Sequence, residues 1–378
     1  MKFIHLSDLH LGKRIYDFSM LEDQRHILGQ ILHSIDEFEP SAVIIAGDIY
    51  DKPVPSAQAL GIFDDFLVEL ARRDLQVFII GGNHDSSDRL SFGSRLIEAS
   101  GIHLTPAYDG RAPLHVLQDE YGPVNIYMLP FLKPAEARQL FPDAEISDYN
   151  DAVRAATAAM MPDESERNIL VTHQFVTGGL TSESEEMAVG GADNVDASVF
   201  EAFDYVALGH LHRPQHVGRE TLRYCGSPLK YSFSEKDHEK SVTLVEMREK
   251  GDIEISTAPL LPLRDMREIR GSYLDVTFKE NYENTDTDDY LRIVLTDEDE
   301  EPDAVLKLRL IYPNLMRLDY DNSRTRALGS PLEFEAEEGK DALELLEEFF
   351  EIQNGIEMST EQREYSRRLF ENIKEGGR

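Results

Sequence analysis

The chain has 378 residues, 41% of them hydrophobic, which is enough for two or three domains with cores of their own. Its 72 acidic residues outnumber the 38 basic ones and give a net charge of −34, which argues against nonspecific wrapping of nucleic acid by a basic surface. A polyanionic substrate is still compatible with this charge, because bound divalent cations make a site locally positive. The single cysteine, Cys225, excludes an internal disulfide and suits a reducing cytoplasm. No apolar run approaches the roughly 18–20 residues of a membrane span, so no membrane association is expected.

Short apolar strands alternate with amphipathic helices over the first 81 residues. Strands are expected at 2–7, 42–47 and 76–81, and helices at 21–38 and 56–74. This alternation predicts an α/β core with parallel strands. In such sheets, ligand-binding residues gather beyond the carboxyl ends of the strands.

Further strands are expected at 124–131, 167–174, 203–212, 222–235 and 240–247, the last two as later strands of a second sheet. The count favours an α/β fold in which a two-sheet sandwich, residues 1–262, is flanked by helices. A change of composition near residue 262 predicts a small α+β capping domain over 263–335, in which residues 271–278 form a strand. The remaining residues, 336–378, are expected to form a helical tail with apolar faces and an N-cap at Ser359 or Thr360.

Candidate metal ligands stand at the ends of five of these strands. They are Asp8, His10, Asp48, Asn83, His173, His210 and His212. All are oxygen or nitrogen donors without a thiolate, which suits manganese, iron or zinc. Seven ligands are too many for one ion and enough for two, if the carboxylate that leaves the middle of the first three strands, Asp48, bridges them. Each motif alone has a structural alternative, such as a turn, a helix cap or a surface histidine.

The order Asp-x-His, Gly-Asp-x-x-Asp, Gly-Asn-His-Asp, a single His and Gly-His-x-His resembles the calcineurin-like metallophosphoesterases. The stretches "IHLSDLHLGK", "AGDIYDKPVPS", "IIGGNHDSSDRL" and "CGSPLKYSFSE" are similar, in more detail, to the double-strand-break repair nucleases of that superfamily. The resemblance covers residues 1–260 and continues more weakly beyond them. It implies two divalent ions, with manganese as the expected metal. One would bind Asp8, His10, Asp48 and His212, and the other Asp48, Asn83, His173 and His210.

The same resemblance gives His84 a catalytic role without metal binding. It would face the scissile phosphate, stabilise developing charge and help protonate the leaving oxygen. Asp85 would orient that imidazole, or cap the following helix instead. Asp51 would orient a ligand histidine, or only cap a turn.

The metal site alone does not identify the phosphoester substrate, because the superfamily includes protein phosphatases, phosphodiesterases, pyrophosphatases and nucleases. Lys13, Arg14 and Tyr16 follow the first two ligands and are candidate DNA contacts, or else a solvated loop. The capping domain and the tail favour a DNA nuclease, acting on duplex ends as an exonuclease and on single strands and hairpins as an endonuclease. The resemblance implies a coiled-coil ATPase as the tail's partner, although the tail has the alternative of docking on its own core. The alternatives for function are a small-molecule phosphodiesterase or nucleotide pyrophosphatase, and a scaffold with a vestigial metal site.

A homodimer is expected through helices at 56–73 and 89–99. Their apolar stripes contain Leu60, Phe63, Leu67, Leu96 and Ile97. Ordinary core packing is the alternative for each of these residues. The expected location is the cytoplasm, at the nucleoid.

Overall fold

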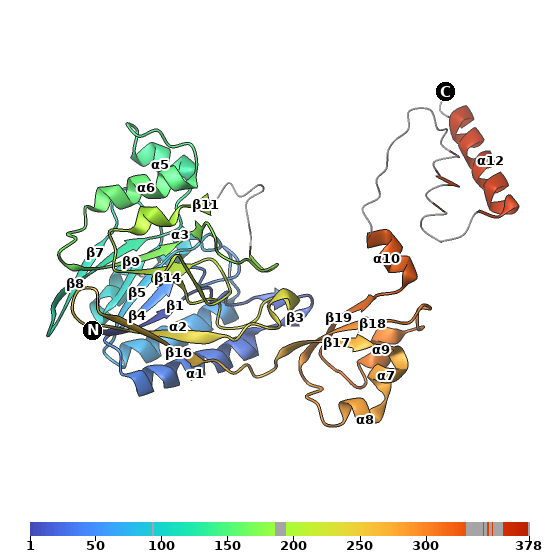
Figure 1. The fold of residues 1–378 in the computed structure, drawn as a ribbon, viewed down its shortest axis with the longest axis horizontal. Coiled ribbons are helices and arrows are strands. Elements are labelled where there is room, and N and C mark those ends of the chain that lie inside the picture. The colour runs from blue at the N-terminus through green and yellow to red at the C-terminus, as the bar shows by residue number, and fades with distance from the viewer. Residues whose placement is uncertain are drawn as a thin grey trace. The chain divides into compact units, whose positions relative to one another are not determined.

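The computed structural model describes residues 1–92, 94–185, 194–329, 343, 346–347, 350 and 358–376. The chain divides into two compact units, Met1–Met266 and Arg267–Arg378 (Figure 1). This division lies close to the boundary expected at residue 262, whereas the boundary expected at residue 335 lies outside the described residues. Within the described part, no helix combines the length and the apolar composition that a membrane crossing requires.

The first sheet of the N-terminal unit has six strands in the order β16-β15-β1-β4-β5-β6. They are β1 (Lys2–Leu6), β4 (Ala42–Ala46), β5 (Gln76–Ile80), β6 (Ile102–Thr105), β15 (Ser241–Met247) and β16 (Ile253–Pro259). Strands β1, β4, β5 and β6 are parallel, while β15 pairs antiparallel with β1. The prediction that 240–247 belongs to the second sheet is therefore wrong. An antiparallel strand added at a sheet edge has the same local pattern in either sheet, so periodicity alone does not assign it.

The second sheet also has six strands, in the order β13-β14-β12-β9-β8-β7. They are β7 (Leu114–Asp119), β8 (Gly122–Leu129), β9 (Arg167–His173), β12 (Tyr205–Gly209), β13 (Gln215–Val217) and β14 (Arg219–Tyr224). Strand β14 ends at Tyr224, so the predicted strand at 222–235 is wrong beyond that residue. Gly226 has a φ of 79° and turns the chain there, and a Cβ at this position would meet the carbonyl of His212.

Side chains from both sheets meet in one apolar core. Ile44 and Phe78 of the first sheet share this core with Ile126 and Val171 of the second. Helices α1 (Leu21–Phe38) and α2 (Ala57–Ala71) flank one side of the unit, and α5 (Pro134–Leu140) and α6 (Tyr149–Met160) the other (Figure 1). The predicted α/β sandwich flanked by helices is confirmed. Because both faces of each sheet are covered at its centre, central strands such as β4 and β12 are apolar and buried along their whole length.

The expected dimer helices are only partly as predicted. Helix α2 is present, but residues 89–99 contain two short helices, α3 (Ser87–Leu90) and α4 (Ser94–Ile97), and a 3-10 turn at Glu98–Ser100. Leu60 is 42% exposed, and Leu67 and Ile97 are half-buried, whereas Phe63 lies in the core against Tyr50. Phe63 is therefore not part of a surface stripe. The side chain of Leu96 lies outside the described residues.

The C-terminal unit contains a three-stranded sheet in the order β17-β18-β19. Its elements are β17 (Met266–Gly271), α7 (Tyr273–Thr277), α8 (Lys279–Tyr282), β18 (Tyr290–Leu295), α9 (Ala304–Leu308), β19 (Leu315–Tyr320), α10 (Ser323–Gly329) and α12 (Thr360–Gly376). The strand predicted at 271–278 is instead α7. Ser272 caps this helix by accepting from the Asp275 amide, and Asp275 accepts in return from the Ser272 amide.

Helix α12 is the part of the expected tail that is described continuously. The Ser359 hydroxyl accepts from the Gln362 amide at 3.2 Å, and Gln362 Oε1 accepts from the Ser359 amide at 2.9 Å. Ser359 is thus the N-cap, one of the two residues expected there. Tyr365 and Leu369 on this helix are 69% and 47% exposed. The side chains of Phe349 and Ile373, also expected on the tail's apolar faces, lie outside the described residues.

Candidate metal centre

The loops that follow β1, β4 and β5 bring four candidate ligands to one edge of the first sheet. The Asp8 amide donates to Gly47 O, and the His10 amide donates to Asp48 O, each at 3.0 Å. Asp8, His10 and Asp48 have φ values of 53°, 43° and 50°. Non-glycine residues in this left-handed region cost of order 1–3 kcal/mol each and cluster at functional sites. Asn83 follows β5 at the same edge.

The second sheet supplies the three remaining candidates. His173 is the last residue of β9, and His210 and His212 follow β12. The His210 amide donates to Asp8 Oδ1 at 3.1 Å and so joins the loop of the second sheet to a candidate ligand of the first. The centre therefore lies where the carboxyl ends of parallel strands from the two sheets meet.

The close contacts among these seven residues fall into two sets around Asp48, and Asp8 also lies close to Asp48 and His173. In one set, His10 Nε2 and His212 Nε2 lie 3.1 Å apart, close to Asp8. In the other, Asn83 Oδ1 lies 3.0 Å from His173 Nε2 and 3.1 Å from His210 Nδ1. Asp48 Oδ2 lies between the sets, 3.7 Å from His10 Nε2 and 3.3 Å from His173 Nε2.

The donors fit divalent cations. All seven residues except Asn83 are buried, with exposed fractions of 5% or less. Burying two neighbouring carboxylates is costly unless positive charge compensates them. Burial alone would lower the pKa of His173, but the Asp48 and Asp8 carboxylates outweigh it and raise the pKa to about 9. The two buried carboxylates thus need a compensating positive charge, and the nitrogen and oxygen donors around them are ligands that manganese, iron and zinc accept.

His84 lies at this centre but is more accessible than the buried ligands. Its amide donates to Asp48 Oδ1 at 3.0 Å, and its Nε2 is 4.0 Å from Asp48 Oδ2. Its Nδ1 lies 3.2 Å from the carbonyl oxygen of Asp51. A carbonyl only accepts, so Nδ1 carries the proton of that bond and Nε2 is directed elsewhere. The side chain is 12% exposed, which lets a substrate approach it.

Comparison with known proteins decides the family. The sequence model described as calcineurin-like phosphoesterase matches residues 1–214, more than half of the chain. The chain belongs to the calcineurin-like phosphoesterase family. A second model, described as the type 5 capsule protein repressor C-terminal domain, matches residues 262–354. The SbcD subunit of the SbcCD nuclease from Staphylococcus epidermidis is 33% identical over 324 residues, which cover 84% of this chain and 85% of that protein.

The chain is thus a homologue of that nuclease subunit, and its phosphoesterase domain carries the metal-binding chemistry of the family. The similarity extends over the C-terminal unit as well as the phosphoesterase domain. This favours the nuclease interpretation over the small-molecule alternative and over a scaffold without activity.

Three residues outside the set of candidate ligands hold His212, a candidate ligand of this phosphoesterase, in place. The Nδ1 of His212 lies 2.7 Å from Ser184 Oγ, which donates to Glu235 Oε1 at 2.5 Å. Lys240 Nζ donates to Glu235 Oε2 at 2.5 Å and to the carbonyl of His212 at 2.8 Å. We call Ser184, Glu235 and Lys240 the positioning network. It fixes the ring of His212 with Nε2 toward the centre.

Glycines let the loops of the phosphoesterase approach one another closely. A Cβ on Gly82 would collide with the side chain and amide of Asp48. A Cβ on Gly209 would collide with the carbonyl of Ala46 and would lie 2.6 Å from His173 Nδ1. The same nitrogen of His173 lies 2.8 Å from Ala46 O, to which it donates. Any side chain at these two glycines would displace residues of the centre.

Asp85 joins two loops. Its carboxylate accepts from the amides of Ile49 and Tyr50 at 3.1 Å and of Gly82 at 3.0 Å. This differs from the expected task of orienting the His84 imidazole, whose Nδ1 is bonded to Asp51. It also differs from the helix-cap alternative, because the cap position of α3 is Ser86. Burial and the Asp48 charge raise the pKa of Asp85 to about 6.

The candidate DNA contacts lie on the loop after His10. Lys13 Nζ is ion-paired with Asp51 Oδ1 at 2.8 Å, and this oxygen lies 3.9 Å from His10 Nδ1. Arg14 belongs to the small hairpin of β2 (Arg14–Ile15) and β3 (Phe18–Ser19) and donates to Asp17 O at 2.5 Å. Tyr16, at the tip of this hairpin, is 51% exposed. The charge of Lys13 is therefore partly neutralised, while Arg14 and Tyr16 face solvent.

Proposed function

We propose that this chain is a metal-dependent DNA nuclease subunit that cuts phosphodiester bonds at the centre around Asp48. Duplex ends would be cut exonucleolytically, and single strands and hairpins endonucleolytically. The observation that carries the proposal is the gathering, from five strand ends, of seven side chains with oxygen or nitrogen donors, one of which is the buried Asp48 carboxylate at their middle. The relative named above is itself called a nuclease, which supports the choice of substrate.

The two sets of donors support a two-ion site. We assign one ion to Asp8, His10, Asp48 and His212, and the other to Asp48, Asn83, His173 and His210. Mn²⁺ is our proposed metal, because the donors are imidazole, carboxylate and amide oxygen. Bound there, two ions would polarise the phosphate and lower the pKa of a nucleophilic water.

His84 is our proposed catalytic residue. Its bond to the Asp51 carbonyl holds the ring so that Nε2 is available on the side of Asp48. With both ring nitrogens protonated, the imidazolium would donate a hydrogen bond from Nε2 to a phosphate oxygen and then give that proton to the leaving 3′ or 5′ oxygen, which leaves a neutral ring with its Nδ1 proton still bonded to Asp51. Asp85 would act as a positioning residue, since it ties the loop that carries His84 to the loop after Asp48.

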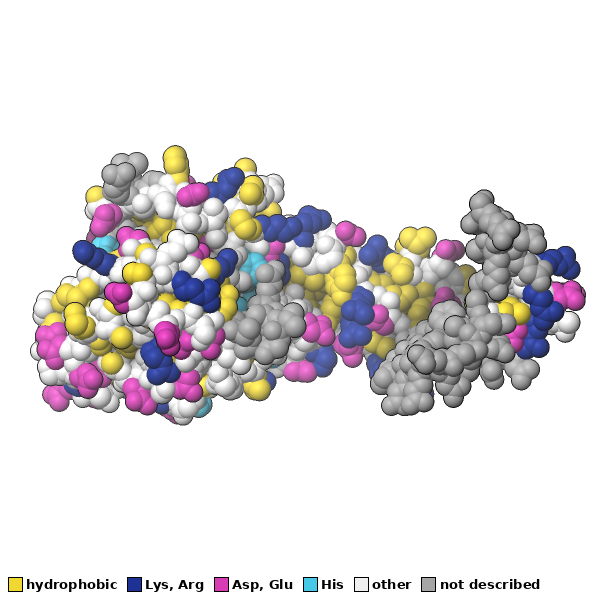
Figure 2. Space-filling model, turned by 90° about the horizontal axis from the view of Figure 1, so that it is seen from above, with side chains coloured by type: hydrophobic (Ala, Val, Ile, Leu, Met, Phe, Trp, Pro, Cys, Tyr) yellow, Lys and Arg dark blue, Asp and Glu magenta, His cyan; other side chains and the backbone are white. Residues whose placement is uncertain are grey.

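The charge distribution supports DNA binding that is divided between this chain and a partner protein. On the face shown in Figure 2, Lys and Arg side chains lie among Asp and Glu side chains, and the chain as a whole has a net charge of −34. Arg14 and Tyr16 would contact DNA beside the metals, and Lys13 would add positive charge there. An SbcC-type coiled-coil ATPase would supply the rest of the DNA contact.

The exposed Tyr365 and Leu369 of α12 support the tail as the attachment point for this ATPase. A chain that ends at residue 357 should no longer co-elute with the ATPase while it keeps the metal centre. Continued co-elution would contradict this part of the proposal.

We also propose a homodimer, located in the cytoplasm at the nucleoid. Leu60 is exposed on α2, and Phe92, between α3 and α4, is 91% exposed, which supports contact through this region. Leu67 and Ile97 would join it from their half-buried positions. A monomeric mass in solution at micromolar concentration would contradict the dimer.

The test of the function compares two classes of substrate. The full chain with Mn²⁺ should cleave a labelled DNA hairpin, and it should leave a panel of cyclic nucleotides and dinucleoside polyphosphates essentially intact. Addition of the ATPase should accelerate only the DNA reaction. Rapid hydrolysis of the nucleotides without DNA cleavage, in the presence of the ATPase, would contradict the proposal.

A further inference from the structure

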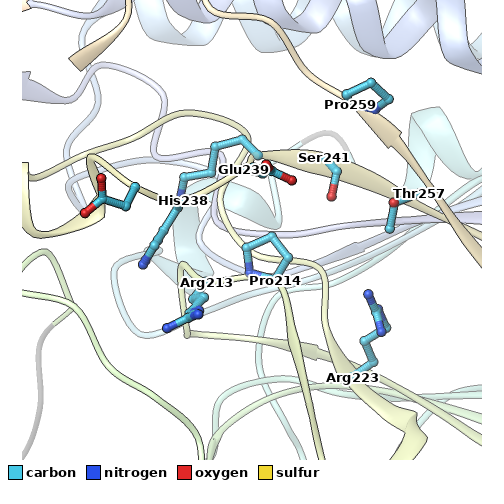
Figure 3. Close-up of a pocket in the computed structure, with 10 residues that line it drawn as sticks. Arg213, Pro214, Arg223, His238, Glu239, Ser241, Thr257 and Pro259 are labelled. Atoms are coloured by element: carbon cyan, nitrogen blue, oxygen red, sulfur yellow. The ribbon is translucent and has the colours of Figure 1, made fainter. Parts of the chain in front are cut away.

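A polar pocket lies apart from the metal centre, between the antiparallel edges of the two sheets. Its volume is about 400 Å³, within the range of small-molecule sites. Arg213 and Pro214 line it from the loop after His212, Arg223 from β14, and Thr257 and Pro259 from β16 (Figure 3). None of the seven candidate metal ligands lines the pocket, although Lys240 of the positioning network is part of the lining.

Two guanidinium groups in this pocket have no acidic partner. Elsewhere in this acidic protein most arginines of the described residues are ion-paired or bonded to carbonyl groups, as Arg73 and Arg219 are. Arg213 and Arg223 form neither kind of side-chain contact within the described part of the chain, and Arg223 Nε is buried without a hydrogen bond. A buried donor left unpaired costs about 1–3 kcal/mol, so this group is prepared for an acceptor that the chain does not supply.

A histidine adds a second unsatisfied group. His238 Nδ1 is buried without a partner and belongs to the same lining. Burial, together with the positive charges of Lys240 and Arg213, lowers the pKa of His238, although Glu235 opposes this. A bound anion would compensate these charges.

The acidic side chains of the lining leave the pocket net positive. Asp237 is paired with Lys236 at 2.6 Å, and Lys240 is already paired with Glu235. Glu239 is exposed. Within the described residues it is the one acidic side chain of the lining that forms no ion pair.

We infer that this pocket binds a phosphate group. Two guanidinium forks, the His238 ring and the hydroxyls of Ser241 and Thr257 offer more donors than the two oxygens of a carboxylate can accept, and they match the oxygens of a phosphate. In Figure 3, Arg223 points into the space between Pro214 and Thr257. The lining contains no Phe, Tyr or Trp on which a base could stack, so the phosphate is the group that is recognised.

The phosphate has two chemical sources, a free phosphate or the backbone of a nucleic acid. Both are tested on the full chain with a chelator, so that neither the metals nor cleavage contributes. Calorimetry with inorganic phosphate, against chloride at equal ionic strength, measures the first source. Fluorescence anisotropy with a short labelled duplex measures the second.

We expect saturable binding in at least one of these arms. The double variant Arg213→Gln/Arg223→Gln should weaken it at least about tenfold, since each arginine would contribute a charge-assisted bond. The control Arg111→Gln/Arg154→Gln also removes two positive charges, both from exposed positions outside the pocket, and should bind like the wild type. If the double variant loses binding of inorganic phosphate, the ligand of the pocket is a free phosphate. If it loses only binding of the duplex, the ligand is the phosphate of a nucleic acid backbone.

A second variant guards against misfolding of the first. Thr257→Glu places a carboxylate on an exposed position of the edge strand β16, where it should not disturb folding, and it should abolish binding by repulsion. Equal affinities of the wild type, the double variant and Thr257→Glu in both arms would overturn the inference. Absence of saturable binding by the wild type in both arms would overturn it as well.

Discussion

At the scale of single residues, the positioning network shows how the protein holds His212, a candidate metal ligand, in one orientation. His212 Nδ1 donates a hydrogen bond to Ser184 Oγ, and the Ser184 hydroxyl donates to Glu235 Oε1. The arrangement leaves Nε2 of His212 with a free lone pair toward His10 and the centre. The buried ion pair of Glu235 with Lys240 keeps the carboxylate charged, and its pKa is lowered despite burial.

We predict that Ser184→Ala weakens metal binding about 10- to 100-fold, because His212 loses the group that fixes its ring. The fold should be retained, since only one hydroxyl is removed. Metal titration followed by calorimetry measures the effect, with Ser165→Ala, an exposed serine remote from the centre, as control. Unchanged metal affinity in Ser184→Ala would show that the hydroxyl does not position His212.

At the scale of elements, the ends of the parallel strands decide where the centre forms. The loop after β5 passes so close to Asp48 that Gly82 has no room for a side chain. At Gly29, inside α1, an added Cβ would instead have no other atom within 4 Å outside the helix backbone and its neighbours. Alanine substitutions at Gly82 and Gly29 should therefore change the stability of the protein in opposite directions.

Gly82→Ala should displace Asp48 and destabilise the protein by roughly 1–3 kcal/mol, as overpacking does, with loss of metal binding. Gly29→Ala should stabilise it by about 0.5–1 kcal/mol, because alanine is favoured in helices. Denaturant unfolding and metal titration of both variants test this. Full metal binding by Gly82→Ala would contradict the close approach of the loops.

The elements also show what the sequence could predict. Five strand ends with their ligands were predictable, since each apolar strand is followed directly by a ligand motif. The positioning network was not, because Ser184, Glu235 and Lys240 are far from His212 along the chain, and Glu235, although it ends the stretch "CGSPLKYSFSE", shows no link to His212 in the sequence. Helix α7 was mistaken for a strand because a five-residue apolar segment has no clear period, although Ser272 and Asp275 were a usable cap signal.

At the scale of the whole unit, a charged cluster joins the two sheets. Asp119, at the end of β7, accepts from the Met1 ammonium group at 2.6 Å and from Arg167 Nη1 at 3.0 Å. Arg167 also donates to the carbonyl of Arg248, just beyond β15, at 2.7 Å. The Arg167 guanidinium, followed by the amino terminus, holds the pKa of Asp119 well below its usual range.

This lowered pKa predicts an acid-sensitive contribution to stability. A carboxyl group with a depressed folded pKa stabilises fully above its unfolded pKa of about 3.9, and the contribution is lost as the pH falls below that value. Asp119→Asn should lower the free energy of unfolding at pH 7 by about 3 kcal/mol and flatten its decline between about pH 5 and pH 2. Urea unfolding across this range measures it, with the exposed Asp143→Asn as control. Parallel pH profiles of Asp119→Asn and the wild type would argue against the cluster's role.

The central claim is that two divalent ions flank Asp48 and that His84 acts on the substrate without binding them. The most direct measurement counts Mn²⁺ per chain and hairpin cleavage in the same samples of wild type, Asp48→Asn and His84→Gln. We predict two ions in the wild type, and loss of both ions and activity in Asp48→Asn. His84→Gln should keep two ions with cleavage reduced about 10²- to 10⁴-fold. Normal cleavage by His84→Gln, or full activity with a single ion in the wild type, would contradict the account.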